Sequence, residues 1–283
     1  MIKKPVATGK LLFFDIDGTL FDDNRNLPAS VKPALVEARK NGHQIIINTG
    51  RTLCNMDHRL DDFPLDGWIM GCGTRVIYHG KTLSSMEHAW PASMRLRAAF
   101  LEMKMPVVYE CDTAIYFDPE IPSNPEIDAF RRFADAHGIA RGIRDDDPEF
   151  RAVKMFCFAT EHAIREMMKR TAGIGMPYSA INRGPDRWEV VPAGYSKGAG
   201  IDELRTALGV GMEDCYAFGD SQNDLSMFQH VGKSIAMGNA TEDIQAVCSY
   251  VTDRPEADGI AKALEHFGLI RRPQAQHGQH QER

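Results

Sequence analysis

Short runs of apolar and β-branched residues, each ended by Gly, Asp or Thr, recur along this chain and restrict its fold more than any other feature. The runs are "KLLFFDIDG", "HQIIINTGR", "GWIMGCG", "CYAFGDS", "SIAMGNA" and "SYVTD". They lack the alternation of apolar and polar residues that marks a strand with one solvated face, so we expect strands buried on both faces. Helical patterns lie between several of them; in "PASVKPALVEARKNG", Val31, Leu35 and Ala38 share one face. Strands of this kind, linked by helices, predict an α/β fold with a parallel sheet covered on both faces.

The middle of the chain departs from this pattern. "RVIYHGKTLS" is typical of a hairpin that turns at His79 and Gly80, "PVVYECDTAIYFD" of two strands in close succession, and "AVKMFCFAT" of another strand. "YSAINRG" and "RWEVVPAG" predict a final hairpin, and helical patterns fall near residues 91–104, 125–138 and 161–172. We interpret this stretch as an α+β block inserted into the α/β sheet.

The inserted block covers residues 85–192. It divides the rest of the chain into two parts of one core domain, residues 1–84 and 193–270. The tail at 271–283 lacks apolar anchors, and we expect it to be disordered.

Composition and charge exclude several classes of protein. The net charge of −6 argues against general binding to nucleic acid or to anionic membranes, which relies on a basic surface. The sequence contains no run of about 18 apolar residues, so we predict no transmembrane helix. "MIKKPVATGK" lacks the apolar centre of a signal peptide. The six cysteines are scattered without a C-x-x-C pair. We interpret them as free thiols of a cytoplasmic protein, not as zinc ligands or disulfides.

Polar residues stand where four of the predicted strands end. They are Asp15 with Asp17, Thr49, the glycine-rich stretch at 71–73, and "GDSQND" at 219–224. In open α/β sheets, ligands bind in the crevice beyond the carboxyl ends of the strands. We therefore expect these residues to meet in one crevice, which Lys197, just before a predicted helix, also reaches.

Up to four carboxylates, those of Asp15, Asp17, Asp220 and Asp224, would share this crevice. Two like charges about 4 Å apart repel by roughly 4 kcal/mol at an effective dielectric of 20. A divalent cation removes that cost, and an all-oxygen ligand set suits Mg²⁺. A calcium loop is the poorer interpretation, because Gly18 follows Asp17 at once.

The paired aspartates divide two chemical roles. An attacking carboxylate must be ionised, whereas a general acid must hold its proton near neutral pH. We assign Asp15 as nucleophile and Asp17 as acid/base. The Thr49 hydroxyl and the Lys197 ammonium would hold the oxygens of a transferring phosphoryl group, and backbone N–H groups around Gly50 would add an anion-binding nest.

Taken together, "DIDGTL", "NTGR", Lys197 and "GDSQND" follow the order of the four motifs of the haloacid dehalogenase (HAD) superfamily, which the chain resembles over about residues 8 to 268. "AMGNA" and "DGIAKAL" resemble its Cof-type sugar-phosphatase branch. The resemblance implies a Rossmann-like core with a mobile α/β cap of the C2B type, inserted between the second and third motifs. The block at 85–192 has that position.

The resemblance also implies residue roles. Asp15 would be the phosphorylated nucleophile and a Mg²⁺ ligand, and Asp17 the acid/base, whose main-chain carbonyl also binds Mg²⁺. Thr49 and Lys197 would bind phosphate, and Asp220 would be the principal further Mg²⁺ ligand.

The other positions carry less defined roles. Asn223 would contact phosphate or orient the site, and Asp224 would support Mg²⁺ or Lys197. The chain departs from the family pattern in "GCGT" at 71–74, where Cys72 replaces an Asn, so a side-chain contact to substrate is not implied there. For Arg51, the sequence leaves open a structural ion pair or a role in the site.

"RGPDRWE", at residues 183 to 189, offers Arg183 and Arg187 on a hairpin of the inserted block. One interpretation is a solvated hairpin beside a partly buried Trp188. The other is a cap loop that reaches over the cleft and binds an anionic or polyol leaving group.

The function we expect is a Mg²⁺-dependent phosphatase that hydrolyses small phosphate monoesters, a sugar phosphate or a phosphorylated cofactor, through an aspartyl-phosphate. Its partner would be a small molecule, with no nucleic acid or membrane, and the chain would be a monomer or homodimer. The alternatives are a phosphoacceptor that resembles response regulators, a non-catalytic binding protein on the same fold, and a phosphomutase. The sequence does not choose the phosphate ester.

Overall fold

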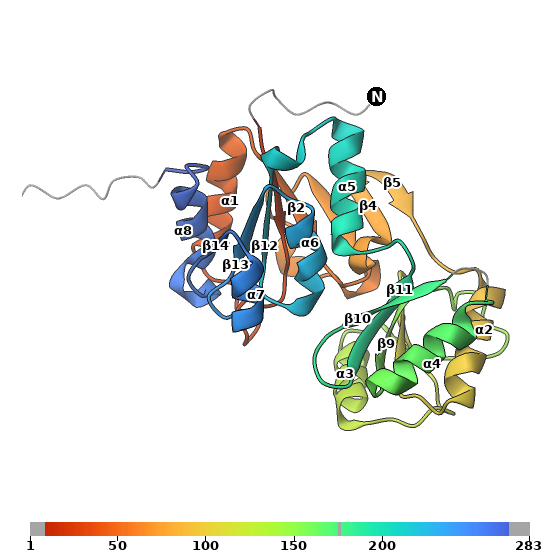
Figure 1. The fold of residues 1–283 in the computed structure, drawn as a ribbon. Helices are drawn as coiled ribbons and strands as arrows, with labels where there is room; N and C mark the ends of the chain where they lie inside the picture. The colour runs from red at the N-terminus through yellow and green to blue at the C-terminus, as the bar shows by residue number, and fades with distance from the viewer. Residues whose placement is uncertain (1–8, 175–176, 272–283) are drawn as a thin grey trace, which may run out of the picture.

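The structure is a computed structural model that describes residues 9–174 and 177–271. Within these residues the chain forms two sheets, which Figure 1 shows as separate lobes connected by the segments that follow β5 and β11. The first sheet has the strand order β14-β13-β12-β1-β2-β3-β4-β5. Its strands are β1 (Leu11–Phe14), β2 (Gln44–Asn48), β3 (Gly67–Met70), β4 (Arg75–Tyr78), β5 (Lys81–Ser85), β12 (Cys215–Gly219), β13 (Lys233–Ala236) and β14 (Tyr250–Val251).

Helices cover both faces of this sheet, as the uninterrupted apolar runs predict. Alternate residues of β1 divide between two cores: Leu12 and Phe14 belong to one, and Leu11 and Phe13 to the other. The first core includes side chains of α1 (Val31–Lys40) and α8 (Gly259–His266). The second includes side chains of α5 (Lys197–Leu208), α6 (Leu225–Gln229) and α7 (Glu242–Val247). All four β1 side chains are fully buried, so this strand lies at the centre of the lobe.

The strands from β14 to β3 are parallel, whereas β4 and β5 extend the sheet as an antiparallel hairpin. The hairpin turns at His79 and Gly80, as predicted, and both have positive φ, 46° and 71°. A two-residue turn of this hand matches the twist of the strands that it joins.

The second sheet lies between the two parts of the first lobe along the chain and has the order β10-β11-β9-β6-β7-β8. Its strands are β6 (Val107–Cys111), β7 (Ile115–Phe117), β8 (Ala140–Gly142), β9 (Ala152–Phe158), β10 (Tyr178–Asn182) and β11 (Arg187–Pro192). The helices α2 (Trp90–Glu102) and α4 (Glu161–Thr171) pack on one face. On the other face, α3 (Pro125–Ala136) packs with β6 and β7, whereas charged side chains of β6, β9 and β11 line a cavity against the first lobe.

The helices expected near 91–104, 125–138 and 161–172 are confirmed as α2, α3 and α4, and the predicted strands and hairpins of the middle region are present. The short strand β8 and the helices α6 and α7 were not predicted, because none is long enough to show a periodic pattern. Because the second sheet and the helices α2, α3 and α4 all lie within residues 85–192, we propose that this range forms a cap domain. The predicted disordered tail lies, apart from residue 271, outside the described residues. No described helix is both long and apolar enough to span a membrane.

His88, in the segment between β5 and α2, is buried in the second lobe, and its Nε2 atom lies 3.2 Å from the Tyr178 hydroxyl. Burial lowers the pKa of His88 from 6.5 to about 4. The folded state therefore resists protonation, so this contribution to stability is present above pH 6.5 and is lost as the pH falls toward 4.

We expect the pH dependence of unfolding to reveal this histidine. Between pH 7 and pH 4, His88 should account for a loss of about 3 kcal/mol in the free energy of unfolding. In His88→Asn, urea unfolding should show a correspondingly smaller loss over the same range. His162→Asn removes an exposed histidine of α4 and is the control, with wild-type pH dependence. Equal slopes in His88→Asn and the wild type would contradict the assignment.

Candidate active site

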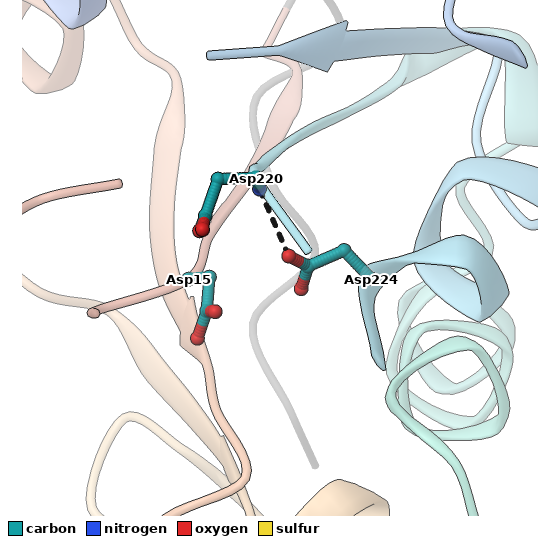
Figure 2. A group of neighbouring side chains, drawn as sticks. All are labelled: Asp15, Asp220 and Asp224. Atoms are coloured by element: carbon teal, nitrogen blue, oxygen red, sulfur yellow. Dashed lines mark hydrogen bonds between the residues drawn. The ribbon is translucent and has the colours of Figure 1, made fainter. Parts of the chain in front are cut away.

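The ends of β1 and β12 bring two of the predicted aspartates to the same edge of the first sheet. The strands pair in parallel, with Phe14 opposite Phe218, and the N–H of Asp15 donates to the Phe218 carbonyl at 3.0 Å. Asp220 follows β12 directly and receives a hydrogen bond from the Thr19 hydroxyl at 3.0 Å. Figure 2 shows Asp15, Asp220 and Asp224 around one small space.

One carboxylate oxygen from each of Asp15, Asp220 and Asp224 lies within 4.8 Å of the others. Burial raises the pKa of Asp15 to about 7, although Lys197 opposes this shift. Burial and the charge of Asp224 raise the pKa of Asp220 to about 8. These carboxylates therefore resist losing their protons together without a cation. The oxygen-only donor set and the unfavourable crowding of negative charge fit Mg²⁺.

Lys197 lies at the centre of the site as the first residue of α5. Its Nζ atom is 2.8 Å from Oδ1 of Asp15 and 2.7 Å from Oδ1 of Asp224, and its side chain is fully buried. Burial disfavours the charged ammonium, but the two carboxylates outweigh it and raise the Lys197 pKa. A permanent positive charge therefore lies at the helix N-terminus, where backbone N–H groups also attract anions.

Asp224 holds the loop that follows β12. Its Oδ2 atom accepts hydrogen bonds from the N–H groups of Asp220 and Ser221, at 2.9 and 3.0 Å, while Oδ1 faces Lys197. The first of these bonds is drawn in Figure 2. Asn223 is buried beside it, and its Oδ1 accepts from the Ser221 hydroxyl at 2.8 Å. Asp224 thus orders the loop and orients Lys197, and it also offers an oxygen to the carboxylate cluster.

Asp17 lies near the other aspartates but binds a different partner. The Arg51 Nε atom donates to Oδ2 of Asp17 at 2.8 Å, and Nη2 donates to Oδ1 at 2.5 Å. Burial opposes ionisation of Asp17, but the hydrogen bonds and charge of Arg51 prevail and hold its pKa below the usual value. The Asp17 side chain is about half exposed, 49%, whereas that of Arg51 is 9% exposed. The structure thus places Arg51 in the site, a choice that the sequence left open.

Gly18 allows the chain to turn directly after Asp17. Its φ is +79°, and a Cβ atom there would lie 2.4 Å from Oδ2 of Asp220. Only glycine adopts this turn without a clash, and the turn keeps Asp220 beside the first motif.

Thr49 and Gly50 follow β2 and face the same cavity as Asp15. The Thr49 side chain is buried, and its hydroxyl accepts a hydrogen bond from the Arg51 N–H at 3.2 Å. The cavity has a volume of about 510 Å³, and Asn223 also contributes to its lining. The strand-end residues predicted from the sequence are therefore brought together.

The cap arginines differ from each other. Arg183, in the turn between β10 and β11, donates to the Ser221 hydroxyl of the core at 3.2 Å. Arg187 is paired with Glu126 of α3 at 3.0 Å and is about half exposed. Both line the cavity, so the structure places both at the cleft.

Three buried charged residues of the cavity wall were not predicted from the sequence: Glu110, Lys154 and Glu189. Each is a charged residue beside apolar residues of a predicted strand, in "PVVYECD", "AVKMFCF" and "RWEVVP". That exception was the available signal, because charged residues are rarely buried unless they are paired. The sequence did not imply a contact between the Cys72 side chain and substrate. Its thiol donates to Oε2 of Glu189 at 3.2 Å, and its backbone adopts φ 57°, ψ 43°.

Comparison with known proteins agrees with the family that the sequence motifs resemble. A sequence model described as haloacid dehalogenase-like hydrolase matches residues 12–264. An HMP-PP phosphatase of Klebsiella pneumoniae is 29% identical, with 91% of this chain and 94% of the relative covered. A 5-amino-6-(5-phospho-D-ribitylamino)uracil phosphatase of Bacillus subtilis is 25% identical, with 92% and 96% covered. A solved sugar phosphatase of HAD subclass IIB has a TM-score of 0.77 and 29% identity, with 92% of this chain and all of that chain (100%) covered.

These relatives are enzymes, which favours catalysis over a phosphoacceptor or a non-catalytic binding protein. The match of the family model extends from β1 to α8 and includes every strand-end motif described above. The chain belongs to the haloacid dehalogenase-like hydrolases and is a phosphatase.

Proposed function

We propose that this phosphatase hydrolyses small phosphate monoesters with Mg²⁺ as cofactor, through a phosphoryl group carried on Asp15. The observation that carries the proposal is the position of Asp15, which contacts the ammonium of Lys197 and has a carboxylate oxygen within 4.8 Å of oxygens of Asp220 and Asp224. A carboxylate in this setting can be kept ionised by cations while it faces a cavity large enough for a small ester.

The substrate's phosphoryl group would bind between Asp15, Thr49 and the start of α5. Lys197 and the Thr49 hydroxyl hold its oxygens, and the backbone N–H groups near Gly50 add further donors. Catalysis of phosphoryl transfer depends mainly on such positioning and on neutralisation of charge. Asp15, Asp220 and Asp224 would hold Mg²⁺, which supplies positive charge to the phosphoryl oxygens and to the crowded carboxylates.

In the first step, a carboxylate oxygen of Asp15 attacks phosphorus, and the bond between phosphorus and the ester oxygen breaks. The leaving oxygen takes a proton from Asp17. In the second step, the oxygen of a water molecule attacks phosphorus while Asp17 takes one of its protons. The bond between phosphorus and the Asp15 oxygen breaks, which releases inorganic phosphate and restores both aspartates. The cap domain excludes bulk water during the first step.

Arg51 sets the protonation of Asp17. With both carboxylate oxygens held by Arg51, Asp17 is ionised and ready to accept a proton from water. For Asp17 to act as the acid in the first step, this contact must loosen when substrate binds. Arg51 is thus a positioning residue for the acid/base.

Substitution of either aspartate tests the two roles. Asp15→Asn removes the attacking charge, and Asp17→Asn removes the proton donor; each should lower kcat by at least about 1,000-fold. Phosphate release from p-nitrophenyl phosphate measures the loss, with Asp61→Asn as the control, because Asp61 is exposed and does not line the cavity. Asp17→Asn should still trap phosphorylated protein with this good leaving group, detectable by mass at Asp15. Rapid hydrolysis by Asp15→Asn would refute the mechanism.

Removal of the cation tests the cofactor. Chelation should abolish turnover, and added Mg²⁺ should restore it, because the carboxylate cluster would otherwise repel the phosphate. Asp220→Asn should raise the Mg²⁺ concentration needed for half-maximal activity by about tenfold or more. Full activity in the chelated wild type would show that no divalent cation is needed.

Arg51 variants test the control of Asp17. Loss of the guanidinium raises the pKa of Asp17 in the free enzyme, where Arg51 holds both of its carboxylate oxygens. The alkaline limb of the kcat/KM profile, which reports on the free enzyme, should therefore move to higher pH in Arg51→Met. We expect kcat at neutral pH to fall by about 10- to 100-fold, since the acid/base is no longer oriented. Arg51→Lys keeps the charge but not the two-pronged hydrogen bond. Its activity and the position of its alkaline limb should therefore lie between those of the wild type and Arg51→Met. An unshifted alkaline limb in Arg51→Met would show that Arg51 does not act on Asp17.

A further inference from the structure

Asp112 joins the turn between β6 and β7 of the cap to the core. It follows β6 directly, and its Oδ2 atom accepts hydrogen bonds from Nε and Nη2 of Arg75 in β4, at 2.9 and 2.5 Å. Its Oδ1 atom accepts a hydrogen bond from the Leu53 N–H of the core at 3.4 Å. The Asp112 side chain is 8% exposed and that of Arg75 is 20% exposed. Loss of the Asp112 charge would therefore leave Arg75 largely buried without this partner.

Cys54 of the core makes a second contact with the same turn. Its thiol donates a hydrogen bond to the Cys111 carbonyl at 3.2 Å. Burial raises the pKa of Cys54 to about 11, so the thiol keeps the proton that it donates. Cys54 also packs against an apolar cluster of the cap that includes side chains of α3, β6 and β7. Among the described residues, it is the one side chain from the core lobe in an apolar cluster of the cap.

The core segment that the cap contacts also holds Arg51. Leu53–Asn55 is a single 3₁₀ turn, and the Asn55 N–H donates to the Thr52 carbonyl at 3.0 Å. The Asn55 carbonyl accepts a hydrogen bond from Nη1 of Arg51 at 3.3 Å, while Nε and Nη2 of Arg51 donate to Asp17. The guanidinium is therefore held from two sides, by the Asp17 carboxylate and by a carbonyl of the 3₁₀ turn.

These contacts form a short path from the cap to the acid/base. Arginine donates its hydrogen bonds in a rigid planar fork, so a shift of the Asn55 carbonyl turns the guanidinium relative to Asp17. Proton transfer requires the acid to lie within hydrogen-bond reach of the leaving oxygen. Cys111 and Asp112 are not among the residues that line the cavity, so they act on the site through the core segment and not by contact with the ester.

We propose that Asp112 is a positioning residue for proton transfer: with Cys111, it holds the 3₁₀ turn of the core and thereby orients Arg51 and Asp17. The inference rests on the proposed function, because it takes Asp17 to protonate the leaving oxygen. The acid/base is fully oriented only while the cap contacts the core through this turn. Proton transfer is thus linked to the arrangement in which the cap excludes bulk water.

Amide hydrogen exchange in the full-length protein tests the contact itself. Asp112→Asn keeps the shape of the side chain but removes the charge that binds Arg75. The amides of residues 51–55 should then exchange faster by about threefold or more. Asp118→Asn is the matched control, because Asp118 is a buried carboxylate whose hydrogen-bond partners, Arg97 and Glu120, both belong to the cap. Wild-type exchange of residues 51–55 in folded Asp112→Asn would overturn the proposal.

Two aryl esters distinguish an orienting role of Asp112 from a merely structural one. The p-nitrophenolate group leaves readily without a proton, whereas phenolate is much more basic and depends on an acid. In Asp112→Asn, kcat/KM for phenyl phosphate should fall by about threefold or more beyond any fall for p-nitrophenyl phosphate. Asp118→Asn should keep the wild-type ratio between the two esters. A structural defect would lower both values alike, and an equal loss in Asp112→Asn would refute the role in proton transfer.

The Arg51→Met background tests whether Asp112 acts through Arg51. If it does, Asp112→Asn changes the ratio between the two esters in the wild-type background but leaves it unchanged in Arg51→Met. An undiminished effect in Arg51→Met would show that the path does not pass through Arg51. Cys54→Ala removes the thiol donor without removing a charge, and should change the ratio in the same direction as Asp112→Asn. It keeps the test in force where Asp112→Asn does not fold.

The proposed function can fail separately. If the wild type with Mg²⁺ hydrolyses neither ester, the proposed function fails, and hydrogen exchange still decides whether Asp112 holds the core segment. If the wild type hydrolyses p-nitrophenyl phosphate but Asp112→Asn shows no selective loss for phenyl phosphate, only the inference about Asp112 fails.

Discussion

The buried ammonium of Lys197 is the interaction on which the rest of the site depends. It lies within 2.8 Å of both Asp15 and Asp224, and among the described residues it is the cation that pairs directly with both of these buried carboxylates. Its position follows from the fold, because Lys197 begins α5, which packs on the second face of the first sheet. One contact thus links the nucleophile after β1, the loop after β12 and the helix that follows the cap.

The cap side of the cavity is polar because α3 covers only part of one face of the second sheet. On the face of α2 and α4, residues such as Met155 and Cys157 enter an apolar core. On the opposite face α3 packs mainly with β6 and β7, so Lys154 and Glu189 face the cavity instead. The same strands therefore carry a core on one side and a polar wall on the other. The core lobe supplies the reacting groups, and the cap supplies groups suited to contact whatever the phosphate is attached to.

Some of the site followed from local pattern. Asp15 and Asp220 each directly follow an apolar run, and parallel strands end at one edge, so their meeting was predictable before any coordinates. The partner of Arg51 was not, because an arginine after a turn can pair with many acids, and only the fold brings Asp17 within reach. Glu110, Lys154 and Glu189 were overlooked, since within its own strand each is typical of a charged side chain that faces solvent. Their register against one another is a long-range property.

The sequence by itself determined the class of fold and the ordered motifs that identify the superfamily, and it predicted an inserted block at residues 85–192. These depend on runs, turns and spacings that lie within a few residues of each other. Tertiary structure alone decided which charges meet: Lys197 with Asp15 and Asp224, Arg51 with Asp17, and Cys72 with Glu189. The physical reason is that Coulomb attraction and hydrogen bonding depend on distances of a few ångströms between groups far apart in the chain.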